Sequence, residues 1–365
     1  MEAERRIGER LIEEAERRIG ERLFELVQRQ EKIDARCDKM LKAVTAIKDR
    51  LQGSGGATAM VDVESSHESL VEEDDPIVQL RSLKQVLEYL DNRTLSHKNT
   101  VNFCQKVLSK KSVEWETALR SEISEPIRDV DLVIAIGGDG TLLHASHLVD
   151  DSIPVLGVNS DPTQPKEVAE FIEEFDATRS TGYLCASTAS NFEEVVDDIL
   201  ENRVQPSELS RMAVAINSKP IPTYALNDIL LAHPCPATVS RFSFRIKKDG
   251  EPSPLLHSRS SGLRVSTGAG STAAMHSAGG FTMPIFSREL QYLVREPIAA
   301  GSNLTHGFVQ SNETMDISWF CREGKLYVDG SNVFHSVELG DTIEMSSRAP
   351  QLKMYLSPEI ISRNK

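Results

Sequence analysis

The sequence has few cysteines, few aromatic residues and no long apolar run. Aromatic residues make up 5% of its 365 residues. No two cysteines show C-x-x-C spacing, which argues against a zinc site or a disulfide framework and favours reduced thiols; the cysteines are Cys37, Cys104, Cys185, Cys235 and Cys321. No window of 18 apolar residues and no apolar signal-peptide core occurs. We therefore expect a cytoplasmic protein without a membrane span.

Basic residues are also in deficit. The chain has 41 Lys and Arg against 55 Asp and Glu, for a formal net charge of −14. A strongly acidic chain binds nucleic acid and anionic membranes poorly, so we expect neither as a partner. An anionic nucleotide can still bind where backbone N–H groups and a few basic side chains gather. No Walker-type lysine motif is present, so the sequence does not identify an ATP site.

The first 75 residues differ from the rest. The segment Glu2–Glu13 is repeated as Glu14–Glu25 with one substitution, and apolar residues then follow a heptad spacing up to Leu51. This pattern predicts a helical, coiled-coil-like extension over residues 1–52, either an oligomerisation helix or one amphipathic helix packed on its own domain. Residues 53–75 begin with Gly-Ser-Gly-Gly and carry seven acidic residues, which predicts an acidic flexible linker.

Residues 76–205 predict an α/β domain. Helical apolar spacing covers Ile77–Leu90 and Lys98–Lys110. The apolar runs Asp131–Ile136 and Pro154–Asn159 are typical of strands buried on both faces, and Thr141–Val149 between them predicts a helix. A strand, a glycine-rich turn, a helix and a strand form a βαβ unit, which indicates a Rossmann-like parallel sheet.

Residues 206–365 predict a second, β-rich domain. Short apolar or alternating runs are separated there by turn residues, which favours a sandwich-like arrangement of strands. The runs are Met212–Ile216, Phe242–Ile246, Gly262–Ser266, Lys325–Val328, Thr342–Met345 and Gln351–Leu356.

The strongest chemical motif follows the first buried strand. It reads Gly137-Gly138-Asp139-Gly140-Thr141. Glycines let the backbone turn tightly and approach a ligand, and the N–H groups with the following helix N-terminus favour an anion. An aspartate there can accept a proton from a substrate hydroxyl during phosphoryl transfer. The alternative is a structural turn in which Asp139 caps the helix.

Two later segments add polar groups. Asn227 and Asp228 stand among apolar residues, where an amide and a carboxylate can bind ribose hydroxyls or a carboxamide, or form an Asn-Asp turn. Ser266–Gly280 is rich in small residues, and its run Gly270-Ser271-Thr272 opens a predicted helix suited to a phosphate or an adenine edge. A close-packed helix start would explain the small residues but not that run.

The order of these three motifs resembles the NAD kinase family over residues 77–358. The resemblance implies that NAD binds between an α/β domain and a β-sandwich-like domain, often at an oligomer contact. It implies that Asp139 is the general base on the 2′-hydroxyl of the adenosine ribose. It further implies that the dinucleotide is bound by the turn glycines and Thr141 together with Asn227, Asp228, Arg259, Gly270, Ser271, Thr272, Ser277 and Asp329.

Several positions depart from the usual family pattern. Thr267–Ala274 lacks the Pro, the second Thr and the Tyr of Thr-Pro-Thr-Gly-Ser-Thr-Ala-Tyr, and Ser160–Thr163 replaces Gly-x-Leu-Gly-Phe. Ser261 stands where many members have Asp. These changes resemble the plant NADH kinase branch, and the lost carboxylate favours NADH over NAD. The family's first apolar strand is replaced by the acidic stretch before Pro76, which indicates either that the sheet lacks that strand or that another segment fills its place.

We therefore expect an ATP- and Mg²⁺-dependent kinase of NADH, and also of NAD, that forms a homodimer or a higher homo-oligomer. The sequence assigns no Mg²⁺ ligands. Two alternatives are a non-catalytic oligomerising variant of this fold and a lipid kinase of the diacylglycerol kinase type. The lipid kinase shares the glycine turn but not the other two motifs in this order.

Overall fold

The computed structural model describes residues 76–363 apart from residues 121, 173–175, 249–250 and 299–304, and the side chains of residues 76–88 fall outside this description. The predicted extension and linker, and the strand predicted to be missing before Pro76, lie outside the described residues. Helix α2 (Pro76–Leu108) opens the described part with 33 residues. It joins the two predicted helical segments into one helix about 50 Å long.

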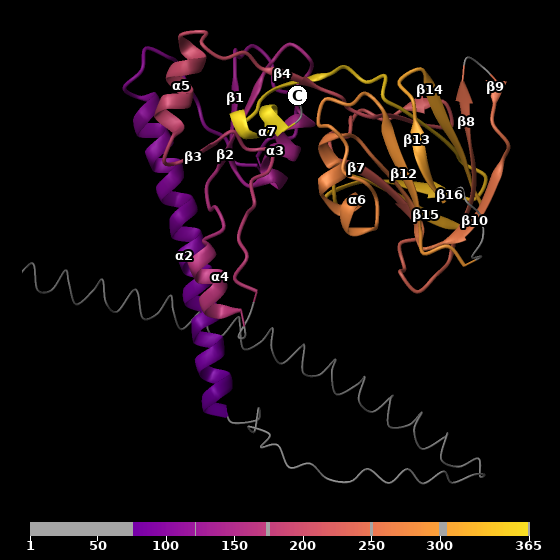
Figure 1. Cartoon of the computed structure of the whole chain (residues 1–365), viewed down its shortest axis with the longest axis horizontal. Helices are drawn as coiled ribbons and strands as arrows, with labels where there is room; N and C mark the ends of the chain where they lie inside the picture. The colour runs from indigo at the N-terminus through magenta and orange to yellow at the C-terminus, as the bar shows by residue number, and fades with distance from the viewer. Residues whose placement is uncertain (1–75, 121, 173–175, 249–250, 299–304, 364–365) are drawn as a thin grey trace, which may run out of the picture. The chain divides into compact units, whose positions relative to one another are not determined.

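The first sheet has the order β1, β2, β18, β4, with β3 also paired to β2 (Figure 1). The pairs β1–β2, β2–β3 and β2–β18 are parallel, as the βαβ pattern predicts, whereas β18–β4 is antiparallel. The prediction of a parallel sheet is therefore correct for four strands and wrong for β4. The strands are β1 (Val133–Gly137), β2 (Val155–Asn159), β3 (Ser187–Thr188), β4 (Ser207–Leu209) and β18 (Leu352–Tyr355).

Helices cover both faces of this sheet. Alternate residues of a strand point to opposite faces, and β2 accordingly contributes Val155 to one apolar cluster and Leu156 to another. The first cluster joins the sheet to α3 and α7, and the second joins it to α2 and α5 (Figure 1). The helices that follow α2 in this part are α3 (Asp139–Ser146), α4 (Pro165–Phe171), α5 (Phe192–Leu200) and α7 (Pro358–Arg363).

Two antiparallel sheets form most of the rest of the described chain. One has the order β10, β8, β14, β17, β5, β6, with β9 paired to β8, and the other has the order β13, β12, β11, β7, β15, β16. The strands are β5 (Ala213–Ile216), β6 (Lys219–Pro220), β7 (Asp228–Ala232), β8 (Ser240–Lys248), β9 (Glu251–Pro252), β10 (Leu256–Ser260), β11 (Gly262–Ser266), β12 (Leu290–Arg295), β13 (His306–Val309), β14 (Glu313–Trp319), β15 (Glu323–Val328), β16 (Val333–Glu338) and β17 (Thr342–Ser346).

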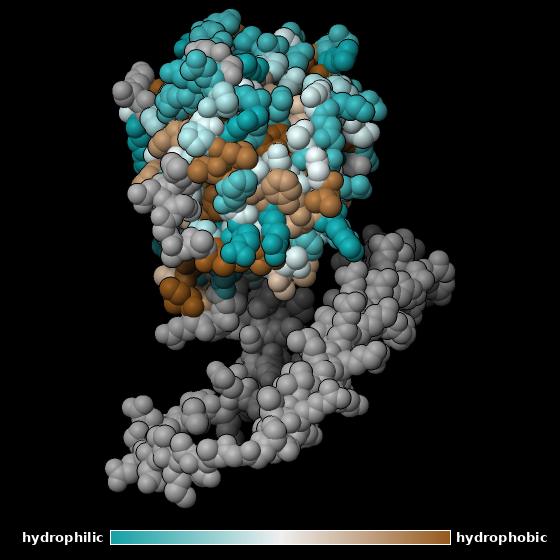
Figure 2. All heavy atoms as spheres, turned by 90° about the vertical axis from the view of Figure 1, so that its right-hand side faces the viewer, coloured by the Kyte–Doolittle hydropathy of each residue, from teal (hydrophilic) through white to brown (hydrophobic). Residues whose placement is uncertain are grey.

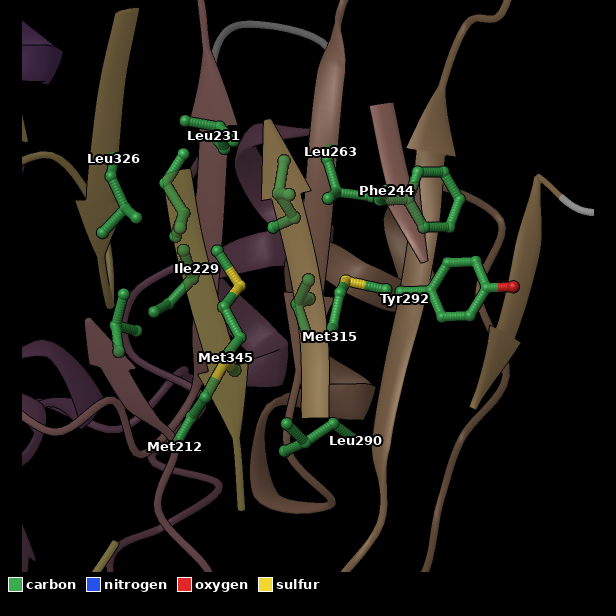
Figure 3. Packing of buried hydrophobic residues seen from close by; sticks show 14 of the residues in the cluster. Met212, Ile229, Leu231, Phe244, Leu263, Leu290, Tyr292, Met315, Leu326 and Met345 are labelled. Carbon is green, nitrogen blue, oxygen red and sulfur yellow. The ribbon is translucent and has the colours of Figure 1, made fainter. Parts of the chain in front are cut away.

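The two antiparallel sheets share one apolar core (Figure 3). Strand β14 buries Met315, Ile317 and Trp319 at alternate positions, and β11 buries Leu263 and Val265 from the other sheet. This is the period of two expected for strands with one buried face. The chain between β11 and β12 forms the short helices η1 (Ala269–Thr272) and α6 (Ala274–Ser277).

No helix among the described residues is long and apolar enough to span a membrane. On the face turned toward the viewer in Figure 2, hydrophobic residues lie interspersed with hydrophilic ones. Exposed apolar side chains among hydrophilic ones are ordinary on folded proteins.

Candidate active site at the β1–α3 turn and the β7 loop

The glycine turn connects β1 to α3, and its neighbours explain its first two glycines. A side chain at Gly137 would overlap Thr141 Oγ1, and a Cβ at Gly138 would lie 2.6 Å from Ser180 Oγ. Gly140 is exposed, and a Cβ there would meet nothing within 4 Å. The first two glycines are therefore needed by close packing, and the third faces open space.

Asp139 is the first residue of α3, and it does not cap the helix. The N-cap position is Gly138, and no side-chain cap bond is present there. The Asp139 carboxylate instead accepts the backbone N–H of Tyr183 at 2.9 Å and that of Leu184 at 2.8 Å. An ionised carboxylate offers about four lone-pair sites. Asp139 is only partly buried, so it keeps accepting capacity beyond the loop that it holds.

A buried thiol lies next to this carboxylate. Cys185 Sγ is 3.9 Å from Asp139 Oδ1. Burial, followed by the charge of Asp139, raises the pKa of Cys185 to about 12. The thiol is therefore neutral at physiological pH, when it is a weak donor to Asp139 and not a nucleophile.

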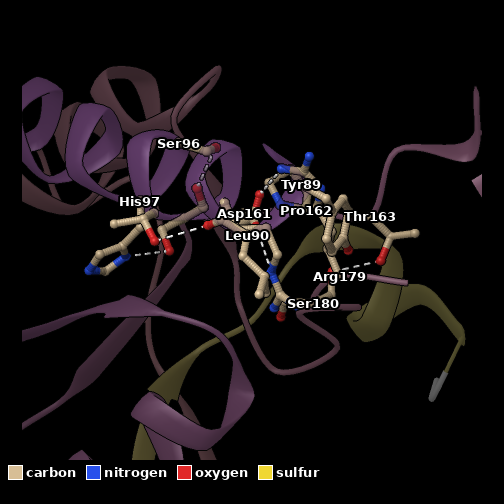
Figure 4. A network of polar contacts seen from close by, with 12 residues as sticks. Tyr89, Leu90, Ser96, His97, Asp161, Pro162, Thr163, Arg179 and Ser180 are labelled. Atoms are coloured by element: carbon tan, nitrogen blue, oxygen red, sulfur yellow. Dashed lines mark hydrogen bonds and ion pairs between the residues drawn. The ribbon is translucent and has the colours of Figure 1, made fainter. Parts of the chain in front are cut away.

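A polar network fixes the segment that follows β2 (Figure 4). Asp161 accepts Arg93 Nε at 3.1 Å and Arg179 Nη1 at 2.6 Å. Arg179 also pairs with Glu167 at 2.7 Å, and its guanidinium lies 5.1 Å from the centre of the Tyr89 ring. The Arg179 side chain is only 4% exposed. Two arginines thus hold Asp161 in the segment that departs from the family pattern.

The same segment joins α2 to the glycine turn. Thr100 and Ser96 donate to the Ser160 carbonyl at 3.1 and 3.4 Å, and His97 Nδ1 lies 2.8 Å from Ser160 Oγ. The Ser160 N–H donates to the Gly137 carbonyl at 3.1 Å. The replacement of Gly-x-Leu-Gly-Phe therefore leaves an anchored segment, with α2 supplying the polar partners.

Asn227 and Asp228 stand at the start of β7, and they differ in environment. Asp228 is buried and forms an ion pair with Arg264 of the neighbouring strand β11. Burial raises the pKa of Asp228, Arg264 lowers it, and the charge of Asp329 raises it. The Asn227 side chain is partly exposed, and it has no hydrogen-bond partner among the described residues. Its amide is therefore available to a ligand.

Asp329 lies in the turn after β15, and its carboxylate is fully buried. Oδ1 accepts the N–H groups of Asn227 at 2.7 Å and Asp228 at 2.9 Å. Oδ2 accepts the N–H of Leu226 at 2.8 Å and Nε2 of His147 at 2.8 Å. Every one of these contacts is with the protein, so the structure brings Asp329 to the Asn227–Asp228 loop.

The segment after β11 packs tightly against the same loop. A Cβ at Gly270 would overlap the Asn227 backbone, and the Thr267 hydroxyl donates to the Leu226 carbonyl. Ser271 is fully buried, where its hydroxyl donates to the Gly268 carbonyl at 2.8 Å and accepts the Met283 N–H at 2.8 Å. This packing accounts for the small residues of the segment.

The remaining predicted binding residues are more exposed. Thr272 is partly exposed and Ser277 is exposed, where the Ser277 hydroxyl donates to the Ala273 carbonyl at 3.5 Å. Arg259 is exposed on the edge strand β10, opposite Arg241, and β10 lies well apart from α3 in Figure 1. Among the described residues, no hydrogen bond or ion pair joins the Arg259 side chain to the other predicted site residues.

Sequence reasoning missed several residues that organise this site. They are His147, Tyr183, Leu184, Arg264 and Thr267. A signal existed for Arg264, because the alternation of β11 points Leu263 and Val265 into the core and Arg264 to the other face beside Asp228. Tyr183 and Leu184 act through backbone N–H groups, which no side-chain pattern reveals. No cluster of three or more metal-ligating side chains was found in the described part of the chain.

Known proteins with similar sequences are NAD and NADH kinases. Residues 69–162 match the ATP-NAD kinase N-terminal domain. The chain is 57% identical over 283 residues to "Probable NADH kinase" of Oryza sativa subsp. japonica, which covers 76% of this chain and 87% of that protein. It is 60% identical over 277 residues to "NADH kinase" of Arabidopsis thaliana, which covers 75% of this chain and 87% of that protein.

Two solved structures share the fold at 20% identity. Yeast NADH kinase complexed with NADH superposes with a TM-score of 0.53 over 64% of each chain. An NAD kinase from Archaeoglobus fulgidus in complex with ATP superposes with a TM-score of 0.56 over 72% of this chain and 92% of that one. The resemblance to NAD kinases and to their plant NADH kinase branch is confirmed. The chain belongs to the ATP-NAD kinase family.

Proposed function

We propose that this protein is an ATP-dependent kinase that phosphorylates the 2′-hydroxyl of the adenosine ribose of NADH, and also that of NAD. The observation that carries the proposal is the identity of 57–60% to two plant NADH kinases over three quarters of the chain. In the reaction the bond between the γ-phosphorus and the bridging oxygen of ATP breaks, and a bond from phosphorus to the 2′-oxygen forms. ADP leaves, and the hydroxyl proton passes to a base.

We assign the role of base to Asp139. Its carboxylate is held by two backbone N–H groups, and it is partly exposed at the N-terminus of α3. Fixed orientation with spare accepting capacity is what a positioned general base requires. The exposed Gly140 beside it leaves room for a substrate, which supports the same assignment.

We assign dinucleotide binding to the glycine turn, Thr141 and the loop that leads into β7 (Leu226–Asp228), called the β7 loop below. The free amide of Asn227 and the carboxylate of Asp228 can together satisfy ribose hydroxyls or the carboxamide. Gly270, Thr272 and Ser277 complete the predicted contact set from the segment after β11. The contacts predicted for Arg259, Ser271 and Asp329 stay predictions.

ATP is the phosphoryl donor in this proposal, and the donor brings Mg²⁺ with it, because nucleotide phosphates are bound and neutralised as magnesium complexes. The part of the chain that the structure describes offers no cluster of metal-ligating side chains. Mg²⁺ therefore has no assigned ligand among the described side chains.

The preference for NADH is a separate part of the proposal. Ser261 replaces a carboxylate, and the loss of that charge disfavours the positively charged nicotinamide of NAD. The Ser261 hydroxyl donates to Glu296, so a carboxylate still stands beside that position. Glu296→Gln removes this charge, and we expect it to raise the ratio of kcat/KM for NADH to that for NAD by about threefold. An unchanged ratio removes the explanation based on Ser261.

The activity is tested with the purified chain, Mg-ATP and either NADH or NAD, with separation of NADPH and NADP by chromatography. NADPH formed ahead of NADP supports the whole proposal. NADP formed at an equal or greater rate would support the kinase activity but contradict the preference for NADH. No product from either substrate favours the non-catalytic variant. Membership of the ATP-NAD kinase family favours the dinucleotide over the lipid alternative.

We also propose the organisation that the sequence predicts: a coiled-coil-like extension over residues 1–52, a linker over residues 53–75, a Rossmann-like domain over residues 76–205 and a sandwich-like domain over residues 206–365. Within that last range, β4, β18 and α7 belong with the first sheet and not with the sandwich. We propose a cytoplasmic homo-oligomer that binds neither nucleic acid nor membranes. Light scattering on the full chain and on a variant that begins at residue 53 tests the extension. An unchanged number of subunits per particle would contradict a role of the extension in oligomerisation.

A further inference from the structure

We propose that His147 and Asp329 are positioning residues, and that their hydrogen bond fixes the helix that carries Asp139 against the loop that carries Asn227 and Asp228. The inference rests on the proposed function, because it concerns how the proposed base is held relative to the proposed dinucleotide site. His147 lies 182 residues before Asp329 in the chain, so the bond joins two distant segments.

The Asp329 carboxylate is organised entirely by its surroundings. Its side chain is 0% exposed, and it accepts three backbone N–H groups of Leu226, Asn227 and Asp228 together with His147 Nε2. Four bonds use about all of the lone-pair sites of a carboxylate. Bonds to an ionised acceptor are stronger than those between neutral groups. One side chain therefore binds three consecutive N–H groups of the β7 loop.

The backbone at Asp329 is adapted to this contact. Asp329 has a φ of +49°, which few residues other than Gly adopt, although Asp is among those that tolerate it. Its own N–H donates to the Asp228 carbonyl at 2.9 Å. The loop and the turn therefore bond to each other in both directions.

His147 brings α3 into this arrangement. It is the C-cap residue of α3, and Asp139 is the first residue of the same helix. The helix has eight residues, so the two ends are about 12 Å apart. A short helix is rigid on this scale, and fixing its last residue restrains its first.

Other contacts restrain the helix at both ends. Tyr183 and Leu184 bond to Asp139 at the beginning. At the end, the buried Arg211 donates to the carbonyls of Ser146 at 3.2 Å and Val149 at 2.9 Å. His147 is the group at this end that reaches Asp329 and so sets the distance to the β7 loop. A displacement of about 1 Å between reacting groups can cost a hundredfold in rate.

The experiment compares His147→Ala with His147→Gln in the full chain. Gln keeps an N–H donor that can reach Asp329, and Ala does not. Ile317→Ala, in the core between the two antiparallel sheets, is the control for a general loss of stability. The values of kcat and KM for NADH are measured at saturating Mg-ATP, well below the unfolding temperature of each variant.

We expect His147→Ala to lose at least tenfold in kcat per folded molecule, and His147→Gln to stay within threefold of the wild type. Ile317→Ala should unfold at a lower temperature with an unchanged kcat. Equal kcat in all three variants, or equal losses in both His147 variants and in the control, would overturn the proposal.

Hydrogen exchange supplies a readout that does not depend on activity. If the wild type phosphorylates neither NADH nor NAD, the proposed function fails, and the link is then judged by exchange alone. Faster exchange at the amides of Leu226, Asn227 and Asp228 in His147→Ala, with restored protection in His147→Gln, supports the link. Exchange at these amides that matches the wild type in both variants overturns it.

Discussion

Two Asp-Gly pairs in this molecule show how differently the same dipeptide can be used. Asp139-Gly140 follows β1, and Asp329-Gly330 follows β15. The Asp139 carboxylate is partly exposed and accepts two backbone N–H groups. The Asp329 carboxylate is fully buried and accepts three such groups and an imidazole. The Asp139 carboxylate can accept further hydrogen bonds, which suits it to contact a substrate. The Asp329 carboxylate has no free acceptor site left, which suits it to hold a loop.

The backbone explains the difference. The first pair belongs to a turn from strand to helix, where Gly140 faces open space. The second pair belongs to the turn between the antiparallel strands β15 and β16, with Asp329 and Gly330 at φ values of +49° and +109°. Residues with positive φ are common in turns between antiparallel strands. One turn therefore opens outward, and the other folds its carboxylate into the protein.

The largest effect is expected for Asp139→Asn. The amide keeps an oxygen that can accept a loop N–H, but it cannot take a proton. We expect kcat to fall by about 10²–10⁴-fold, the usual contribution of a general base. The unfolding temperature, measured by calorimetry, should fall by only a few degrees, because the amide keeps one of the two N–H contacts. Near-normal turnover in this variant would remove the proposed base and with it the contrast between the two carboxylates.

Asp329→Ala should instead act mainly on stability. It leaves three backbone N–H groups and the His147 ring without their acceptor in a buried site. We expect the free energy of unfolding to fall by about 3–5 kcal/mol, the usual cost of breaking a buried charged arrangement. Urea denaturation followed by circular dichroism measures it. If the free energy of unfolding falls no further than in Asp139→Asn, the two turns do not differ in the way their contacts indicate.

Arg264→Gln probes the third carboxylate, Asp228. Arg264 lowers the pKa of Asp228 against the effect of burial, so its loss raises that pKa further. Asp228 then takes up a proton at a higher pH, and the acidic limb of the profile of kcat/KM for NADH should move to higher pH. We expect kcat/KM at pH 7 to fall about tenfold, as for one hydrogen bond to a charged group. Arg264→Lys keeps the positive charge, so its kcat/KM should fall less than that of Arg264→Gln.

The smallest effect concerns Cys185 beside Asp139. Its pKa is raised from 9.0 to about 12 on folding, so the unfolded chain loses the proton first as pH rises. Stability that is fully present below pH 9 is therefore lost above it. At pH 10 the wild type should have lost about 1 kcal/mol of its free energy of unfolding through this thiol. Cys185→Ala should show a flatter decline between pH 8 and 10, and an equal slope would contradict the raised pKa.

The sequence predicted the parts of the fold that depend on local pattern. The buried strands β1 and β2, the turn between β1 and α3, and the span Gly262–Ser266 of β11 follow from short apolar runs and glycine chemistry. The run Gln351–Leu356 was predicted as a strand, but nothing local indicates that β18 pairs with β2 in the first sheet. Pairing partners distant in sequence depend on packing, which no local pattern encodes.

The candidate site shows the same division. Its motif residues were predicted, because glycines and paired polar residues stand out among apolar neighbours. His147 was not predicted. Its role depends on the hydrogen bond to Asp329, which lies 182 residues later in the sequence, and no local pattern indicates that contact. Tyr183 and Leu184 contribute backbone groups only, and any sequence that keeps the turn can supply them.

The place of β18 bears on how the protein is made. Strand β18 lies between β2 and β4, with Met354 opposite both Val155 and Ser207. A ribosome releases the first strands of this sheet long before the residues that complete it, and during that time the part of β2 at Val155 and Leu156 has no final partner on the side of β18. Such an edge can pair wrongly with another chain. We therefore expect the nascent chain to depend on chaperones until synthesis ends, and a chain truncated before residue 352 to aggregate.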